Sequence, residues 1–142
     1  VCAVVYKRRP RRLGHRRGPR RMAVVVRAVD ASGKAAITCD EPLAAMYRQG
    51  TAAADAIVVL ENKAPKWSSA SMAYMLDFGG RVTEASSKNF QLISLDCDSY
   101  VAVQFGKTGP DAYALDWRFP VSPLMAFGVA VSIMVRKNMR VL

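Results

Sequence analysis

The sequence has few of the side chains that metal binding and nucleophilic catalysis require. Its 142 residues include one histidine, His15, and three widely separated cysteines, Cys2, Cys39 and Cys97. No Cys-x-x-Cys pair or Cys/His cluster with ligand spacing occurs, so we predict neither a metal site nor a cofactor. The single histidine lies within the arginine-rich stretch, so we expect no ordinary Ser–His or Cys–His nucleophile pair either. We therefore expect a protein that is not an enzyme, and the unpaired cysteines are typical of a reducing compartment.

Three short patterns match parts of functional motifs but lack the remainder. Ser87 and Lys88 are adjacent, but we expect this pair to belong to the fold rather than to catalysis. Residues 106–108 read Gly-Lys-Thr, as at the end of a phosphate-binding loop, but Val101 stands where that loop needs glycine. Asp96 and Asp98 have no third oxygen ligand at calcium-loop spacing, which favours a solvated turn.

Acidic residues are absent from the first 27 residues, which hold ten lysines and arginines. The other 11 basic residues are balanced by 11 acidic residues, so the net charge of +10 comes from this one stretch. It indicates a neutral domain with a basic loop at residues 7–21. The candidate anion-binding residues are Lys7, Arg8, Arg9, Arg11, Arg12, Arg16, Arg17, Arg20 and Arg21.

The basic loop predicts a polyanionic partner. Arginine outnumbers lysine nine to one in the first 27 residues, and its planar fork favours bidentate contacts with phosphate or carboxylate. Expected partners are anionic lipid head groups, nucleic acid or an acidic protein surface; a solubilising loop is the alternative. The stretch follows an apolar segment and is interrupted by proline and glycine, so we expect neither a secretory leader nor an amphipathic transit peptide.

Alternating and β-branched stretches predict a mainly β chain with short connections. The expected strands are 1–6, 22–29, 56–61, 72–78, 81–85, 90–95, 101–105 and 113–117, with an irregular loop at 62–71. Gly79 and Gly80 favour a tight turn, and a short helix is expected at 42–49, ended by Gly50. We expect Trp117 to pack in the core and Trp67 to be more open.

The C-terminal segment predicts a buried helix over about residues 123–137. Ser122 is a suitable cap, Pro123 suits the first turn, and residues 124–135 are apolar on every side apart from Ser132. A helix that is apolar all round is buried. At about 20 Å it is shorter than a bilayer span, so we expect burial within protein rather than in lipid.

Several longer motifs resemble the tubby-like family. They are Gly-Pro-Arg-Arg-Met at 18–22, Leu-Glu-Asn-Lys-Ala-Pro-Lys-Trp at 60–67, Phe-Gly-Gly-Arg-Val-Thr at 78–83, Ala-Ser-Ser-Lys-Asn-Phe-Gln at 85–91, Gln-Phe-Gly-Lys at 104–107 and Asp-Trp-Arg-Phe-Pro at 116–120. The resemblance implies a mainly β (α+β) fold, an antiparallel barrel or partial barrel wrapped around the apolar C-terminal helix. Residues 1–142 would be the C-terminal portion of one such domain.

The resemblance also implies a phosphoinositide-binding, membrane-associated adaptor in trafficking or signalling. Its expected location is cytoplasmic, peripheral to a membrane or in the cilium, with the nucleus as an alternative. The family's first strands, which carry most of its head-group ligands, would precede Val1, so none of those ligands is carried over. An open sheet edge would then need a protein partner. The alternative is a structural subunit of a ciliary axoneme or ribonucleoprotein, with the basic loop on acidic protein or nucleic acid.

Overall fold

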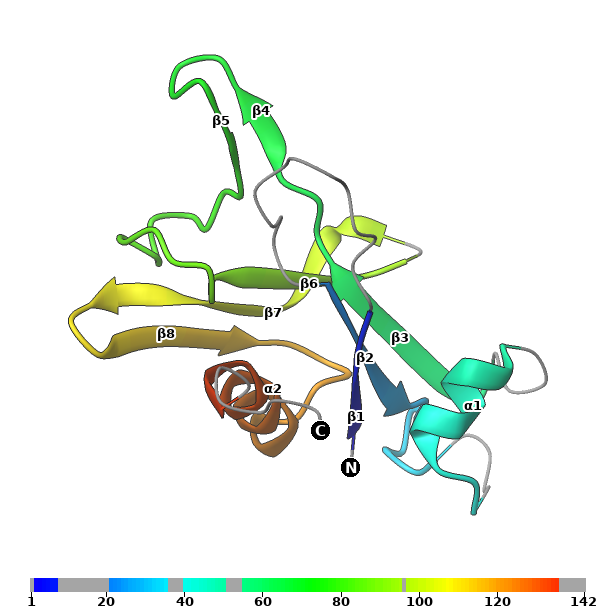
Figure 1. Cartoon of the computed structure of the whole chain (residues 1–142). Coiled ribbons are helices and arrows are strands. Elements are labelled where there is room, and N and C mark those ends of the chain that lie inside the picture. The colour runs from blue at the N-terminus through cyan, green and yellow to red at the C-terminus, as the bar shows by residue number, and fades with distance from the viewer. Residues whose placement is uncertain (1, 8–20, 36–39, 51–54, 96, 136–142) are drawn as a thin grey trace, which may run out of the picture.

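The computed structural model describes residues 2–7, 21–35, 40–50, 55–95 and 97–135 (Figure 1). These ranges form mainly β-structure with two helices. In chain order the elements are β1 (Cys2–Tyr6), β2 (Met22–Arg27), α1 (Leu43–Gln49), β3 (Ile57–Asn62), β4 (Lys66–Ser68), β5 (Ala73–Met75), β6 (Phe90–Ser94), β7 (Cys97–Gly109), β8 (Ala112–Trp117) and α2 (Pro123–Val135).

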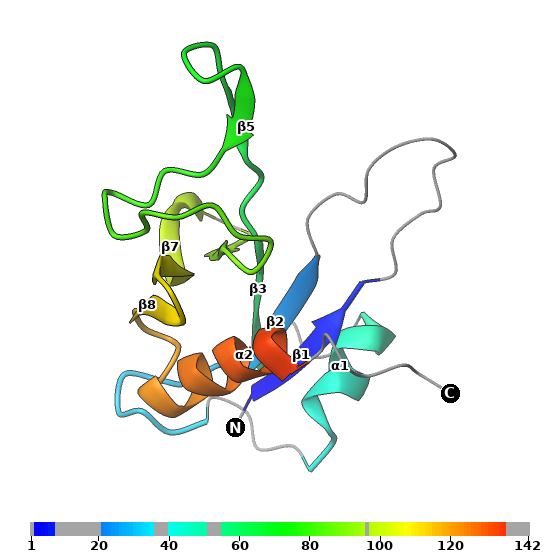
Figure 2. The same cartoon turned by 60° about the vertical axis from the view of Figure 1, so that its left-hand side comes forward.

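Six strands form one antiparallel sheet in the order β1-β2-β3-β6-β7-β8. The sheet curls around α2, and the helix contacts the two edge strands β1 and β8 (Figures 1 and 2). The hydroxyl groups of Tyr6 and Ser132 are 2.9 Å apart and connect β1 to the helix. The predicted partial barrel around a C-terminal helix is therefore confirmed.

Strand β2 lies at the centre of the packing because both of its faces are covered. Met22, Val24 and Val26 belong to the core that includes α2, whereas Val25 packs with Leu43 of α1 on the other side of the sheet. All five residues from Met22 to Val26 are at most 1% exposed. A strand covered on both faces requires an unbroken apolar run, which is what this segment provides.

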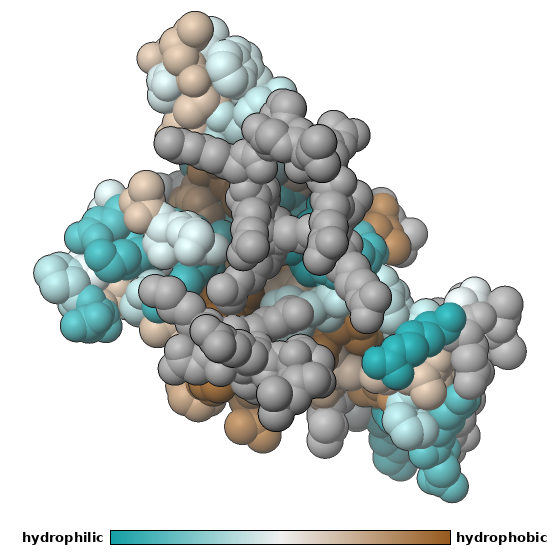
Figure 3. Space-filling view, in the orientation of Figure 1, coloured by the Kyte–Doolittle hydropathy of each residue, from teal (hydrophilic) through white to brown (hydrophobic). Residues whose placement is uncertain are grey.

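Helix α2 is buried along only one face, which corrects the expectation of burial all round. Its buried residues are Ala126, Val129, Ala130 and Ile133. The side that faces away from the sheet exposes 81% of Leu124 and 62% of Phe127. Apolar atoms reach the surface at this position in Figure 3. Among the described residues the sheet covers one side of this apolar helix only, so apolar side chains on its other side stay exposed. No helix in the described part of the chain is long and apolar enough to cross a bilayer.

The segment at residues 77–84 lies across the outer face of the sheet, held there by polar side chains of neighbouring strands. Gln91 of β6 donates its amide to the Asp77 carbonyl at 2.7 Å and to the Gln104 side chain at 2.6 Å. Gln104 of β7 donates in turn to the carboxylate of Asp116 on β8 at 3.2 Å. We call Gln91, Gln104 and Asp116 the polar row.

Two predicted strands and one predicted core residue are wrong. Within the expected strand 72–78 only Ala73–Met75 is extended, paired with Lys66–Ser68 inside the expected loop 62–71. Residues 81–85 form no strand, because this segment bonds to the sheet through side chains and a few backbone groups. Trp117, expected in the core, is 44% exposed because it stands at the end of an edge strand.

The end of the short helix is confirmed, and Gly79 and Gly80 form a turn as expected, but it is not the expected hairpin because residues 81–85 form no strand. Gly79 and Gly80 have φ of 57° and 75°, and Gly50 ends α1 with φ of 69°. These left-handed conformations favour glycine because it has no Cβ. The end of the predicted helix at 136–137 lies outside the described residues.

Candidate anion-binding site at the basic end of the sheet

The basic loop joins the sheet at a point that the structure describes on both sides. The backbone N–H of Lys7 donates to the carbonyl of Arg21 at 3.0 Å, continuing the β1–β2 pairing beyond Tyr6 and Met22. Lys7 and Arg21 therefore lie side by side at this end of the sheet, and the sequence between them leaves and returns here.

The Lys7 ammonium group is committed to an ion pair with Glu61 at the end of β3. Its Nζ lies 2.6 Å from Glu61 Oε1, and the two side chains are 37% and 28% exposed. This hydrogen bond raises the pKa of Lys7, so the lysine stays protonated. Glu61 thus offsets the charge of one of the nine candidate cations.

The same end of the sheet carries two lysines that the charge count did not single out. Strand β3 is tied to β2 here, because the Met22 N–H donates to Asn62 Oδ1 at 2.6 Å. Lys63 follows at once, and its N–H donates to the carbonyl of Gln91 at 2.9 Å. Lys66 comes three residues later and is exposed. Both lysines lie in the motif at 60–67 that resembles the tubby-like family, which was the signal in the sequence that could have indicated them.

The remaining candidate residues lie outside the described part of the chain. They are Arg8, Arg9, Arg11, Arg12, Arg16, Arg17 and Arg20. His15 lies outside it as well. The proposed role of these arginines therefore rests on their sequence and on the position of Lys7 and Arg21.

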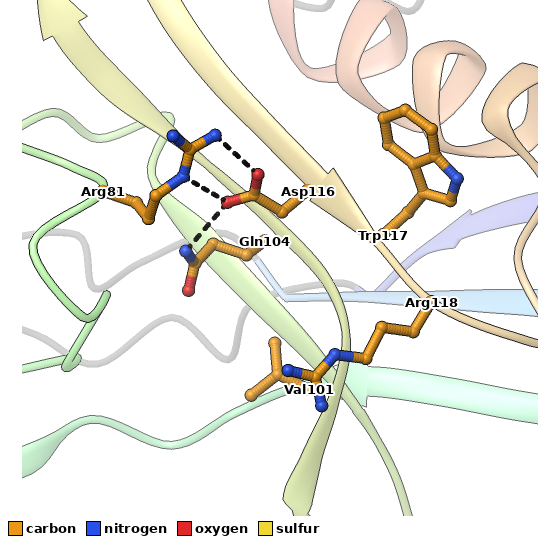
Figure 4. Close-up of a pocket in the computed structure, with 6 residues that line it drawn as sticks. All are labelled: Arg81, Val101, Gln104, Asp116, Trp117 and Arg118. Atoms are coloured by element: carbon orange, nitrogen blue, oxygen red, sulfur yellow. Dashed lines mark hydrogen bonds and ion pairs between the residues drawn. The ribbon is translucent and has the colours of Figure 1, made fainter.

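A second concave region lies on the outer face of β7 and β8 (Figure 4). This hollow of about 290 Å³ is lined by Arg81, Val101, Gln104, Asp116, Trp117 and Arg118. The guanidinium of Arg81 bonds Asp116 through two nitrogens at 2.8 and 3.2 Å. The same contact lowers the pKa of Asp116 and raises that of Arg81, so the pair is ionised at neutral pH. Arg118 stacks on Tyr100, with its Cζ 5.8 Å from the ring centroid.

The hollow is better explained as part of the fold than as a binding site. Asp116 accepts hydrogen bonds from Arg81 and from the side-chain amide of Gln104. One of the two arginines that line the hollow is therefore already neutralised. Among the described residues, no group of three or more His, Cys, Asp or Glu side chains has the arrangement to hold a metal ion.

Comparison with known proteins decides the family. The chain matches the family model described as Tub family over residues 1–135. The chain belongs to the Tub family. It is 37% identical over 136 residues to human Tubby-related protein 1, covering 93% of this chain and 24% of that protein. It is 34% identical over 141 residues to Tubby protein homolog 1 of Caenorhabditis elegans, covering 93% of this chain and 32% of that protein. Mouse Tubby-related protein 2 is 39% identical over 119 residues, covering 82% of this chain and 21% of its own length. The chain therefore spans at most about a third of these Tub-family relatives.

The motifs that carry the Tub-family resemblance meet on the outer face of the sheet. Four separate motifs supply Arg81, Gln91, Gln104 and Asp116, which are connected by hydrogen bonds. Figure 4 shows the bonds that join Arg81 and Gln104 to Asp116. Another motif residue, Asn89, donates to the carbonyl of Glu84 at 2.8 Å. In this Tub-family chain these motif residues thus hold the 77–84 segment on the sheet.

Proposed function

We propose that this chain is a non-enzymatic tubby-like module that binds phosphoinositides or other anionic lipid head groups and acts as a membrane-associated adaptor in trafficking or signalling. The observation that carries the proposal is the junction of Lys7 and Arg21, which attaches the arginine-rich sequence to one end of a rigid sheet. The proposed location is cytoplasmic, peripheral to a membrane or within the cilium.

The charge of the basic loop is sufficient for membrane attachment. A basic residue near an anionic bilayer contributes about 1 kcal/mol, and about 1.4 kcal/mol corresponds to a tenfold change in affinity. Contact by about half of the nine candidate cations therefore gives a preference of roughly a thousandfold for anionic over neutral membrane. Because exposed charges are screened by salt, this preference falls as ionic strength rises.

Vesicle co-sedimentation tests the proposal. The chain is mixed with phosphatidylcholine vesicles, with and without a few per cent of a phosphoinositide, over a salt series. Binding to the anionic vesicles alone is expected, and replacement of Arg8, Arg9, Arg11 and Arg12 by glutamine should abolish most of it. The control replaces Lys34 by glutamine, because this lysine is exposed in the turn with Asp30 beyond the other end of β2. Failure of the unaltered chain to bind anionic vesicles at low salt would refute the proposal.

A second candidate function is that of a structural subunit in an axoneme or a ribonucleoprotein. It is favoured by the exposed apolar side of α2, where Leu124 and Phe127 stand away from the sheet, and by the open edges β1 and β8. A protein partner would cover these surfaces, and the basic loop would contact acidic protein or nucleic acid. Binding to RNA or DNA at physiological salt, without binding to anionic vesicles, would favour this function over the first.

A further inference from the structure

The pair of strands β4 and β5 projects from the body of the molecule as a separate finger, residues 66–75 (Figures 1 and 2). The two strands pair only with each other, in the register Lys66 to Met75, Trp67 to Tyr74 and Ser68 to Ala73. Because neither strand pairs with the main sheet, side chains on both faces of the finger reach solvent. A two-stranded hairpin alone is at best marginally stable in water.

The finger exposes an unusual share of large apolar side chains. Met72 is 73% exposed, Tyr74 70%, Trp67 53% and Met75 51%. Single exposed apolar residues are common on protein surfaces, but a cluster of them marks a contact surface. Trp67 and Tyr74 pack only edge to face on each other, with ring centroids 5.2 Å apart.

The tip of the finger places its most exposed apolar residue in a left-handed conformation. Met72 has φ of 49°, a region that non-glycine residues rarely adopt. The turn is held by Ser71, whose N–H donates to Ser68 Oγ at 3.4 Å and whose hydroxyl lies 2.8 Å from the Met75 sulfur. Glycine or asparagine would suit such a position better if the turn had only to reverse the chain.

The charges within the finger and the segment that leads into it are of one sign, although Glu61 and Asp77 flank this range. Residues 62–76 contain Lys63 and Lys66 and no aspartate or glutamate. The finger follows directly from the end of β3, where Asn62 bonds to the start of β2 and Glu61 pairs with Lys7. It therefore leaves the sheet at the end where Lys7 and Arg21 lie.

We propose that the finger inserts its tip into the interfacial layer of an anionic bilayer. Tryptophan and tyrosine favour the level of the lipid head groups, methionine is flexible and apolar, and lysines at the margin reach toward phosphate. A protein groove would also accept apolar side chains, but an acid-free finger beside a basic loop fits an anionic surface better. The inference rests on the proposed membrane function and adds an apolar contact to the electrostatic one.

Tryptophan fluorescence separates this inference from the proposed function. In a Trp117→Phe variant, Trp67 is the only tryptophan of the chain. Vesicles of phosphatidylcholine with phosphatidylserine or phosphoinositide should shift the Trp67 emission to shorter wavelength, and lipids brominated near the head group should quench it. Vesicles of phosphatidylcholine alone should do neither at the same lipid concentration.

Co-sedimentation of paired variants gives the second readout. Replacing Met72 and Met75 by serine should weaken binding to anionic vesicles about tenfold, in keeping with the loss of two apolar contacts. The matched control replaces Leu124 and Phe127 by serine, two apolar residues of α2 that are 81% and 62% exposed. Co-sedimentation of the unaltered chain with no change in Trp67 emission and no effect of the methionine substitutions would overturn the finger inference and leave the proposed function standing. Absence of co-sedimentation would overturn both.

Discussion

Replacing Gly106 in β7 by alanine is expected to destabilise the fold, because there is no space for a Cβ at this position. A Cβ at this position would lie 2.6 Å from Val82 Cγ1 and 3.0 Å from Val82 Cβ. Rotation of the valine cannot remove the second of these contacts. The backbone around Val82 would have to move, yet the N–H groups of Thr83 and Glu84 bond to the Lys107 carbonyl at 3.2 and 3.1 Å.

The size of the effect follows from overpacking. Forcing an extra methyl group into a packed site costs about 1–3 kcal/mol, and we expect Gly106→Ala to lower the free energy of unfolding by that amount. Gly128 in α2 provides the control, because a Cβ there meets nothing within 4 Å. Gly128→Ala should raise the free energy of unfolding by about 0.5–1 kcal/mol, since alanine is the better helix former.

Urea unfolding followed by circular dichroism measures both changes. The two substitutions add the same methyl group and are expected to act in opposite directions. Val82→Ala in the Gly106→Ala background should recover part of the loss, since it removes both methyl groups that clash and keeps only the Cβ. A Gly106→Ala variant as stable as the unaltered chain would refute the close approach of the 77–84 segment to β7.

Three further predictions concern ionisable groups. Arg81 lowers the pKa of Asp116 below its usual 3.8. The stability that this ion pair supplies is therefore complete above about pH 4 and is lost as the pH falls further. Asp116→Asn should remove that part of the acid dependence in urea unfolding, and an unchanged pH profile would contradict the role given to the pair. A hydrogen bond with Ser99 lowers the pKa of the exposed Cys97 thiol, whereas burial raises the pKa of Cys2. Mass spectrometry should therefore find Cys97 alkylated by iodoacetamide before Cys2. The reverse order would be evidence against the fold at these two sites. Glu61→Gln releases Lys7 from its ion pair and should strengthen co-sedimentation with anionic vesicles; weaker binding would show that Glu61 positions the lysine instead of competing for it.

The sequence predicted the strands of the main sheet better than the segments outside it. The valine-rich run of β2 reports burial directly, since its side chains face a core on both sides of the sheet. In β8 the alternation correctly placed Tyr113 and Leu115 against the core. Alternation at 72–78 predicted one continuous strand, but only Ala73–Met75 is extended, and within the described ranges no second layer covers it. Periodicity indicates which side chains share a face; it does not indicate whether anything covers that face.

The candidate site was predictable in its composition and not in its surroundings. The nine basic residues were evident from the charge pattern, but the pairing of Lys7 with Glu61 joins positions 54 residues apart. Lys63 and Lys66 reach the same end of the sheet only because β3 lies beside β2. The exposure of Trp117 likewise depends on its position at the end of an edge strand.

The contact between α2 and β1 has a consequence for the order in which the chain folds. The hydroxyl groups of Tyr6 and Ser132 meet across 126 positions of sequence, so the first strand is synthesised long before the helix that covers it. During translation the valine-rich β1–β2 hairpin therefore exists without its inner cover, and contacts of such long range form slowly. We expect nascent chains arrested before residue 123 to bind chaperones that recognise apolar β-strands, and chains extended through α2 to be released from them.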